Sequence, residues 1–173
     1  MRKGIYILPN LLTTGNLMCG FWAIISVFQE QFYYAAVAIL LAAVFDAFDG
    51  KVAKLSGATS KFGVQYDSLA DLVSFGVAPA LLAFSWALRP YGKFGWLAAF
   101  TFVACGAIRL ARYNVLASAG DTKYFKGVPI PVAAAMIALT IHLYLRLIET
   151  GWIKDVVILV MIYVLAFLMV SNI

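Results

Sequence analysis

The order of apolar and polar residues divides the chain into six long apolar segments joined by shorter polar ones. Each segment is close to the roughly 20 residues that an α-helix needs to cross the hydrocarbon core of a bilayer. The segments lie at about 12–29, 33–55, 66–88, 94–117, 130–148 and 153–171. No repeat or low-complexity linker marks a second domain. The pattern therefore predicts an all-α polytopic membrane protein, with one bundle of six transmembrane helices over residues 1–173.

Composition leads to the same class of protein. Of the 173 residues, 64% are hydrophobic and only 12% are charged. A typical soluble domain has roughly 45–50% apolar and about 25% charged residues. A chain of this size has too much surface to bury so much apolar side chain in one aqueous core, and too little charge to be disordered. These numbers exclude a soluble globular domain and a disordered one.

The distribution of basic residues predicts the orientation in the membrane. Six spans place both termini on one side, and nine of the 13 lysines and arginines fall in the segments on that side. Cytoplasmic loops carry the excess of basic residues in membrane proteins. We therefore expect the cytoplasmic membrane, with both termini and the polar chemistry on the cytoplasmic side. The net charge of +5 then indicates contacts with membrane lipids, and no nucleic-acid partner is expected.

Four of the eight acidic residues lie within or beside two neighbouring apolar segments. Asp46 and Asp49 are three residues apart, and Asp67 and Asp71 are four apart, so each pair shares one face of a helix. Two antiparallel helices would bring both pairs to the same depth near the cytoplasmic side. Charged carboxylates are costly within a membrane, and four together repel one another. The cluster therefore needs a cation.

Three interpretations of these acids are open from their spacing. Two hard divalent cations, Mg²⁺ or Mn²⁺, would suit a cluster of oxygen ligands and could serve phosphoryl transfer. Proton-relay or ion-pathway acids of a small transporter are the second, and structural pairing is the third. A transport path needs polar residues across the whole bilayer, yet 35–45 and 77–88 are almost entirely apolar. The spacing favours metal binding.

Small residues and hydrogen-bond donors lie between the two acid pairs. Glycine and alanine leave room for a ligand near the backbone, although they also allow close packing of membrane helices. Lysine, serine and threonine donate hydrogen bonds to phosphate oxygens. The residues of these two kinds are Gly50, Ala53, Gly57 and Gly63, and Lys54, Thr59, Ser60 and Lys61. Together with the acids they indicate a phosphate or nucleotide ligand.

The whole motif resembles the signature of the CDP-alcohol phosphatidyltransferase family, D-x2-D-G-x2-A-R-x8-G-x3-D-x3-D. This sequence reads Asp46-x2-Asp49-Gly50-x2-Ala53-Lys54-x8-Gly63-x3-Asp67-x3-Asp71. Lys54 replaces the arginine of the signature, which keeps the charge but loses the bidentate fork. The resemblance implies a six-helix membrane enzyme that transfers a phosphatidyl group from a CDP-linked lipid to an alcohol and releases CMP. It also implies a homodimer.

The resemblance assigns residues to this reaction by position. Asp46, Asp49 and Asp67 would hold two divalent cations, and Asp71 would complete the metal site and act as general base. The residues that would contact the CDP-linked lipid are Asn10, Thr13, Gly50, Ala53, Lys54, Ser60 and Gly63.

Segments outside the signature suggest the alcohol. Residues 67–79, 109–115 and 125–131 are similar to segments of the membrane-bound phosphatidylserine synthases, a branch of this family. That similarity implies L-serine as acceptor and either CDP-diacylglycerol or an ether-lipid equivalent as donor. Residues expected to bind the serine are Arg109, Arg112, Asn114 and Lys126. The alternative role for the basic residues among them is to anchor the cytoplasmic face and to contact lipid headgroups. A separate alternative is a transferase of the same family whose acceptor is glycerol phosphate or inositol phosphate.

Three further expectations concern residues outside the site. His142, the single histidine, is expected to pack or to hydrogen-bond between helices. Ile5 to Leu8 are expected to form a short interfacial helix before the first span. The chain ends at Ser171-Asn-Ile173 without a polar or basic tail, which indicates a shortened C-terminus.

Overall fold

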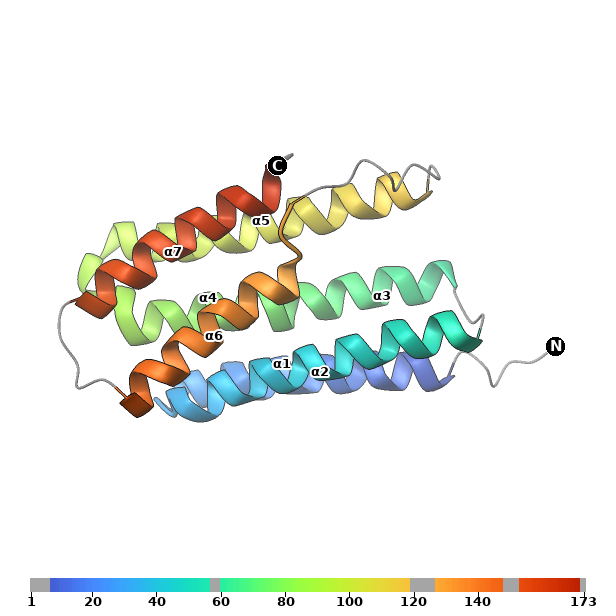
Figure 1. Ribbon diagram of the computed structural model, residues 1–173, viewed down its shortest axis with the longest axis horizontal. Coiled ribbons are helices and arrows are strands. Elements are labelled where there is room, and N and C mark those ends of the chain that lie inside the picture. Colours follow the sequence, from blue (N-terminus) through green and yellow to red (C-terminus); the bar gives the residue numbers. More distant parts are fainter. Residues whose placement is uncertain (1–6, 57–59, 119–126, 148–152, 172–173) are drawn as a thin grey trace.

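The computed structural model describes residues 7–56, 60–118, 127–147 and 153–171, and within these ranges it contains helices and no strand (Figure 1). Five of the helices are α1 (Ile7–Phe28), α2 (Phe32–Ser56), α5 (Lys93–Ser118), α6 (Ile130–Leu147) and α7 (Ile153–Val170). The sixth is a continuous helical rod from Lys61 to Tyr91. Along it follow α3 (Lys61–Asp71), the π-helix η2 (Leu72–Val77), α4 (Ala78–Ala83), the π-helix η3 (Phe84–Leu88) and the 3₁₀-helix η4 (Arg89–Tyr91).

The helices agree closely with the predicted spans, and the largest differences are at the starts of the first and third spans. Helix α1 begins at Ile7 rather than at about residue 12, and the rod begins at Lys61 rather than at about residue 66. Ile7 and Leu8, expected in a separate interfacial helix, belong to α1, whereas Ile5 and Tyr6 of that expected helix lie outside the described residues. Polar side chains can line the end of a helical bundle without breaking its helices, since the backbone hydrogen bonds stay within each helix.

Helices α1 and α2 form an antiparallel hairpin, and the rod from α3 to η4 packs against α1. Helix α6 lies on α2, and α7 pairs with α5. The start of α1, the end of α2, the start of α3 and the end of α5 all lie at one end of the molecule (Figure 1). The ring centroid of His142 on α6 lies 4.8 Å from that of Tyr33 on α2, which confirms its expected packing role.

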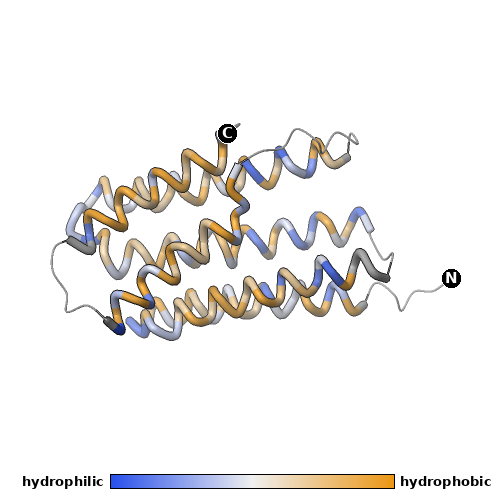
Figure 2. The backbone as a smooth tube through the Cα atoms, viewed as in Figure 1, coloured by the Kyte–Doolittle hydropathy of each residue, from blue (hydrophilic) through white to orange (hydrophobic). Residues whose placement is uncertain are grey.

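Many alanines lie in the interior beside large residues such as Phe75 and Phe102, and other large apolar residues face outward. Ala35, Ala38 and Ala134 are fully buried, whereas Phe100 and Phe167 are exposed. Such a distribution is typical of membrane bundles, in which small residues allow helices to approach and lipid surrounds the large ones. Figure 2 shows apolar residues along most of each helix and polar ones gathered where α3 begins and α5 ends.

Four helices in the described part of the chain are long and apolar enough to cross a membrane. They cover Leu8–Phe28, Phe32–Val52, Lys61–Tyr91 and Lys93–Ala117. Helices α6 and α7 are also apolar but shorter. The structure therefore supports a helical membrane protein.

Candidate functional site

Three carboxylates converge between the second half of α2 and the second half of α3. Asp46 and Asp49 extend from α2 and Asp67 from α3, and one oxygen of each lies within 4.8 Å of the others. Asp71 lies one turn after Asp67 on the same face of α3, beside the Asp46 carboxyl group. The helical spacing of each pair and the antiparallel arrangement of the helices thus produce the cluster that the sequence predicted.

The cluster has the chemistry of a divalent-cation site. Asp49 is only 5% exposed and Asp71 only 7%, so water screens their charges poorly. The Oδ1 atom of Asp67 is buried and has no hydrogen-bond partner among the described residues. Converging carboxylate oxygens are the ligands that Mg²⁺ and Mn²⁺ prefer, and a cation would both satisfy this atom and offset the repulsion. The residues present therefore fit the ions that the sequence predicted.

Helix α1 supports the cluster with two hydrogen bonds. The Thr13 hydroxyl donates to Oδ2 of Asp49 at 2.9 Å, and Nδ2 of Asn16 donates to Oδ1 of Asp71 at 2.9 Å. Thr13, expected to contact the CDP-linked lipid, is therefore bound to a carboxylate. Asn16 was not among the predicted site residues. Its position three residues after Thr13, on the same face of an apolar helix, was the available signal.

The described residues predicted to contact the CDP-linked lipid gather at the same end of the molecule. Asn10 lies near the start of α1 and Gly50 near the end of α2. Ser60 caps α3, because its Oγ atom accepts a hydrogen bond of 2.9 Å from the backbone N–H of Gly63. A methyl group at Gly50 would meet no described atom within 4 Å, so the space beside that backbone is open.

Two further predicted contacts, Ala53 and Lys54, belong to α2, but their side chains lie outside the described residues.

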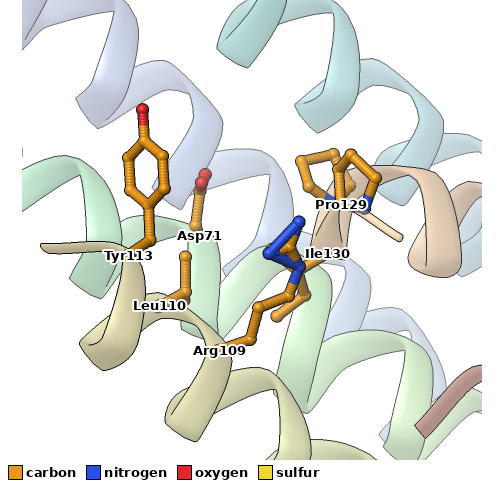
Figure 3. A pocket seen from close by; sticks show the side chains of 7 residues that line it. Asp71, Arg109, Leu110, Tyr113, Pro129 and Ile130 are labelled. Carbon is orange, nitrogen blue, oxygen red and sulfur yellow. The ribbon is translucent and has the colours of Figure 1, made fainter. Parts of the chain in front are cut away.

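A cavity of about 230 Å³ opens beside Asp71. Its lining residues come from α3, α5 and the start of α6, and they are Asp71, Arg109, Leu110, Tyr113, Pro129, Ile130 and Pro131. Figure 3 shows the Asp71 carboxylate and the Tyr113 ring pointing in a similar direction, while the Arg109 guanidinium lies near Pro129 and Ile130. A carboxylate and a guanidinium in an otherwise apolar cavity suit a small molecule that carries both a donor and an anionic group.

Arg109 is the predicted serine-binding residue that lines this cavity. Its Nε atom donates to the carbonyl oxygen of Val128 at 2.6 Å, and Nη2 donates to that of Gly127 at 3.2 Å. The guanidinium thus also fixes the backbone that leads into α6. This double contact between α5 and the segment before α6 could not be inferred from the sequence.

The other predicted serine contacts lie elsewhere. Arg112 is exposed and does not line the cavity. The Nδ2 atom of Asn114 donates to the Ser68 hydroxyl at 2.9 Å, which joins α5 to α3 one residue after Asp67. Lys126 lies outside the described residues. Tyr113 lines the cavity without having been predicted, because one tyrosine among nine gave no signal.

The sequence profile of the CDP-alcohol phosphatidyltransferase family matches residues 6–170. The chain belongs to this family. It is therefore a transferase, and the cluster of aspartates at the ends of α2 and α3 coincides with the family's signature positions.

Curated relatives of this CDP-alcohol phosphatidyltransferase are similar along most of its length. A CDP-diacylglycerol–serine O-phosphatidyltransferase of Helicobacter pylori is 38% identical over 169 residues, which are 98% of this chain and 71% of the relative. A protein of the same name from Bacillus subtilis is 39% identical over 137 residues, or 79% and 76% of the two chains. The archaetidylserine synthase of Methanothermobacter thermautotrophicus is 41% identical over 133 residues, or 76% and 56%.

Proposed function

We propose that this protein transfers a phosphatidyl group from a CDP-linked lipid to the hydroxyl of L-serine, which forms phosphatidylserine and CMP. The observation that carries the proposal is the convergence of Asp46, Asp49 and Asp67 beside Asp71, which in turn lines a cavity with Arg109. The names of the relatives from Helicobacter pylori and Bacillus subtilis support serine as the acceptor.

Asp46, Asp49, Asp67 and Asp71 would hold two divalent cations, Mg²⁺ or Mn²⁺. When bound, such ions neutralise the phosphates and stabilise the charge on the attacking and leaving oxygens. Thr13 keeps Asp49 in place through its hydrogen bond. Ligand carboxylates held in this way lose less freedom when an ion binds.

Asp71 is the proposed general base. It takes the proton from the serine hydroxyl as that oxygen forms a bond to the phosphorus on the lipid side of the diphosphate. The bond between this phosphorus and the oxygen of CMP breaks, and its electron pair leaves with CMP. Asp71 suits this role because it belongs to the acid cluster and also lines the cavity.

Arg109 is the proposed partner of the serine carboxylate, because a guanidinium binds a carboxylate through charge and directed hydrogen bonds. Its place in the cavity with Asp71 supports this assignment. Arg112, Asn114 and Lys126 remain predicted serine contacts.

The CDP moiety would lie at the end of the molecule where α2 stops and α3 starts. We assign Asn10, Gly50, Ala53, Lys54, Ser60 and Gly63 to its binding. The open space beside Gly50 supports a ligand at the helix backbone. Thr13 acts through Asp49.

We propose that all six helices cross the cytoplasmic membrane as one domain over residues 1–173, with both termini and the site on the cytoplasmic side. Helices α6 and α7 have 18 residues each, or about 27 Å at a rise of 1.5 Å per residue, close to the hydrocarbon thickness of about 30 Å. A homodimer remains a prediction from the family resemblance.

The decisive experiment measures CMP release by the purified full chain from CDP-diacylglycerol, with or without L-serine and with Mg²⁺, Mn²⁺ or EDTA. We expect release only with both serine and a divalent cation. Asp71→Asn should reduce turnover by at least about 100-fold while CDP-lipid binding is retained. Release supported by glycerol 3-phosphate or inositol phosphate instead of serine would contradict the proposed acceptor. Replacing the donor by its ether-lipid equivalent identifies the lipid class.

A further inference from the structure

Asn16 is a polar residue buried in the apolar interior beside α1. Its side chain is fully buried, and its Nδ2 atom donates to Oδ1 of Asp71 at 2.9 Å. We propose that Asn16 is the positioning residue of the general base: its amide holds one oxygen of Asp71 so that the other faces the acceptor hydroxyl. This inference rests on the proposed function, in which Asp71 takes the proton from serine.

A purely structural role does not explain an asparagine at this position. Its Oδ1 atom is buried and has no hydrogen-bond partner among the described residues. A buried carbonyl oxygen without a partner lowers the stability of a fold, so an apolar side chain of similar size would serve packing better. The hydrogen bond to Asp71 is what an apolar residue could not supply.

A second hydrogen bond, from Ser74 to the backbone of Asn16, fixes the position of Asn16 along α1 relative to Asp71. The hydroxyl of Ser74, itself fully buried, donates to the backbone carbonyl oxygen of Asn16 at 3.0 Å. Ser74 belongs to the π-helix η2, which begins directly after Asp71. Asp71 therefore binds the side chain of Asn16, and Ser74 binds its backbone. Because π-helical turns are rare and often occur at functional sites, their place beside Asp71 agrees with this assignment.

The chemistry of a carboxylate explains why such a residue is useful. An aspartate can rotate about its last side-chain bond and exchange its two oxygens. The hydrogen bond from Asn16 to Oδ1 restricts this rotation, so that Oδ2 keeps one orientation towards the acceptor hydroxyl.

The test replaces Asn16 by an apolar residue of similar size and by a smaller one, in Asn16→Leu and Asn16→Ala. Both variants lose the donor, so we expect kcat to fall about 10- to 100-fold, as for other residues that orient ligands or bases. The KM for the CDP-linked lipid should stay within about threefold. The melting temperature of Asn16→Leu should stay close to that of the wild type, because the loss of the bond to Asp71 is offset by the removal of the buried, unpaired Oδ1 atom.

Ser26→Ala is the matched control. Ser26 is another buried polar residue of α1, and its Oγ atom also has no hydrogen-bond partner among the described residues. It lies near the opposite end of α1, so this variant should keep the kcat of the wild type. Unchanged kcat in both Asn16 variants overturns the positioning role, as does a loss that tracks a fall in melting temperature. A wild-type chain without serine-dependent CMP release overturns the proposed function itself.

Discussion

Thr13 illustrates how a single residue contributes through its neighbour. The sequence predicted that it contacts the CDP-linked lipid, whereas its hydroxyl donates to Asp49 and its side chain is only 4% exposed. A buried hydroxyl that donates a hydrogen bond to a carboxylate fixes the orientation of that carboxylate. Where the carboxylate is a metal ligand, the loss of such a hydrogen-bond partner typically lowers metal affinity about 10- to 100-fold.

We therefore predict that Thr13→Val, which keeps the shape but loses the donor, raises the Mn²⁺ concentration for half-maximal activity about 10- to 100-fold. Thr13→Ser keeps the donor and should stay within a few-fold of the wild type. The measurement is CMP release titrated with Mn²⁺. An unchanged Mn²⁺ requirement together with a raised KM for the CDP-linked lipid would return Thr13 to the lipid-binding role.

At the scale of elements, the site depends on the close approach of α1 to the π-helix η2. Gly20 of α1 lies directly against Ser74, so that a methyl group on Gly20 would come within 2.6 Å of the Ser74 Cα atom. That distance is well below van der Waals contact, and one of the two helices would have to move. Asn16 also belongs to α1, and Asp71 directly precedes η2, so a change in this packing also displaces the two residues of the site.

We predict that Gly20→Ala destabilises the fold by about 1–3 kcal/mol through overpacking and also lowers kcat, because α1 is displaced from Asp71. Gly50→Ala is the contrasting variant. No described atom lies within 4 Å of the added methyl group, and alanine favours a helix over glycine by about 1 kcal/mol. Its melting temperature should be unchanged or higher, while the KM for the CDP-linked lipid rises. Thermal unfolding in detergent and steady-state kinetics distinguish the two, and equal melting temperatures would refute the packing argument.

At the scale of the whole molecule, polar residues gather at the ends of an apolar bundle, most of them at the end where α3 begins and α5 ends (Figure 2). Asp46, Asp49 and Asp67 lie at this end, whereas the ion pair of 3.6 Å between Arg89 and Glu30 lies at the other. A substrate with a charged nucleotide head and apolar tails can place its head at this end and its tails in the bilayer.

This arrangement predicts a labelling pattern for single cysteines in a chain whose Cys19 and Cys105 are replaced by alanine. Lys61, the first residue of α3, and Lys93, the first residue of α5, are both exposed and lie at opposite ends of the bundle. In intact cells, a membrane-impermeant maleimide should label Lys93→Cys, whereas Lys61→Cys should react only after permeabilisation. The reverse pattern would place the site on the outer face and contradict the positive-inside assignment.

Local periodicity along the chain is sufficient to predict the helices and the acid cluster. Residues three or four apart share a helix face, so their spacing alone places each aspartate pair on one face of its helix. The family signature can be recognised in the sequence for the same reason, because it consists of a few residue types at fixed short spacings.

Which helices face each other, and at what height, depends instead on tertiary packing. The hydrogen bonds from Thr13 to Asp49 and from Asn16 to Asp71 cross from α1 to α2 and to α3. The cavity that joins Asp71 to Arg109 and Tyr113 requires α3, α5 and the start of α6 together. Such contacts depend on the rotation and crossing of helices, which small residues such as Gly20 and Ser74 set through packing rather than through sequence spacing.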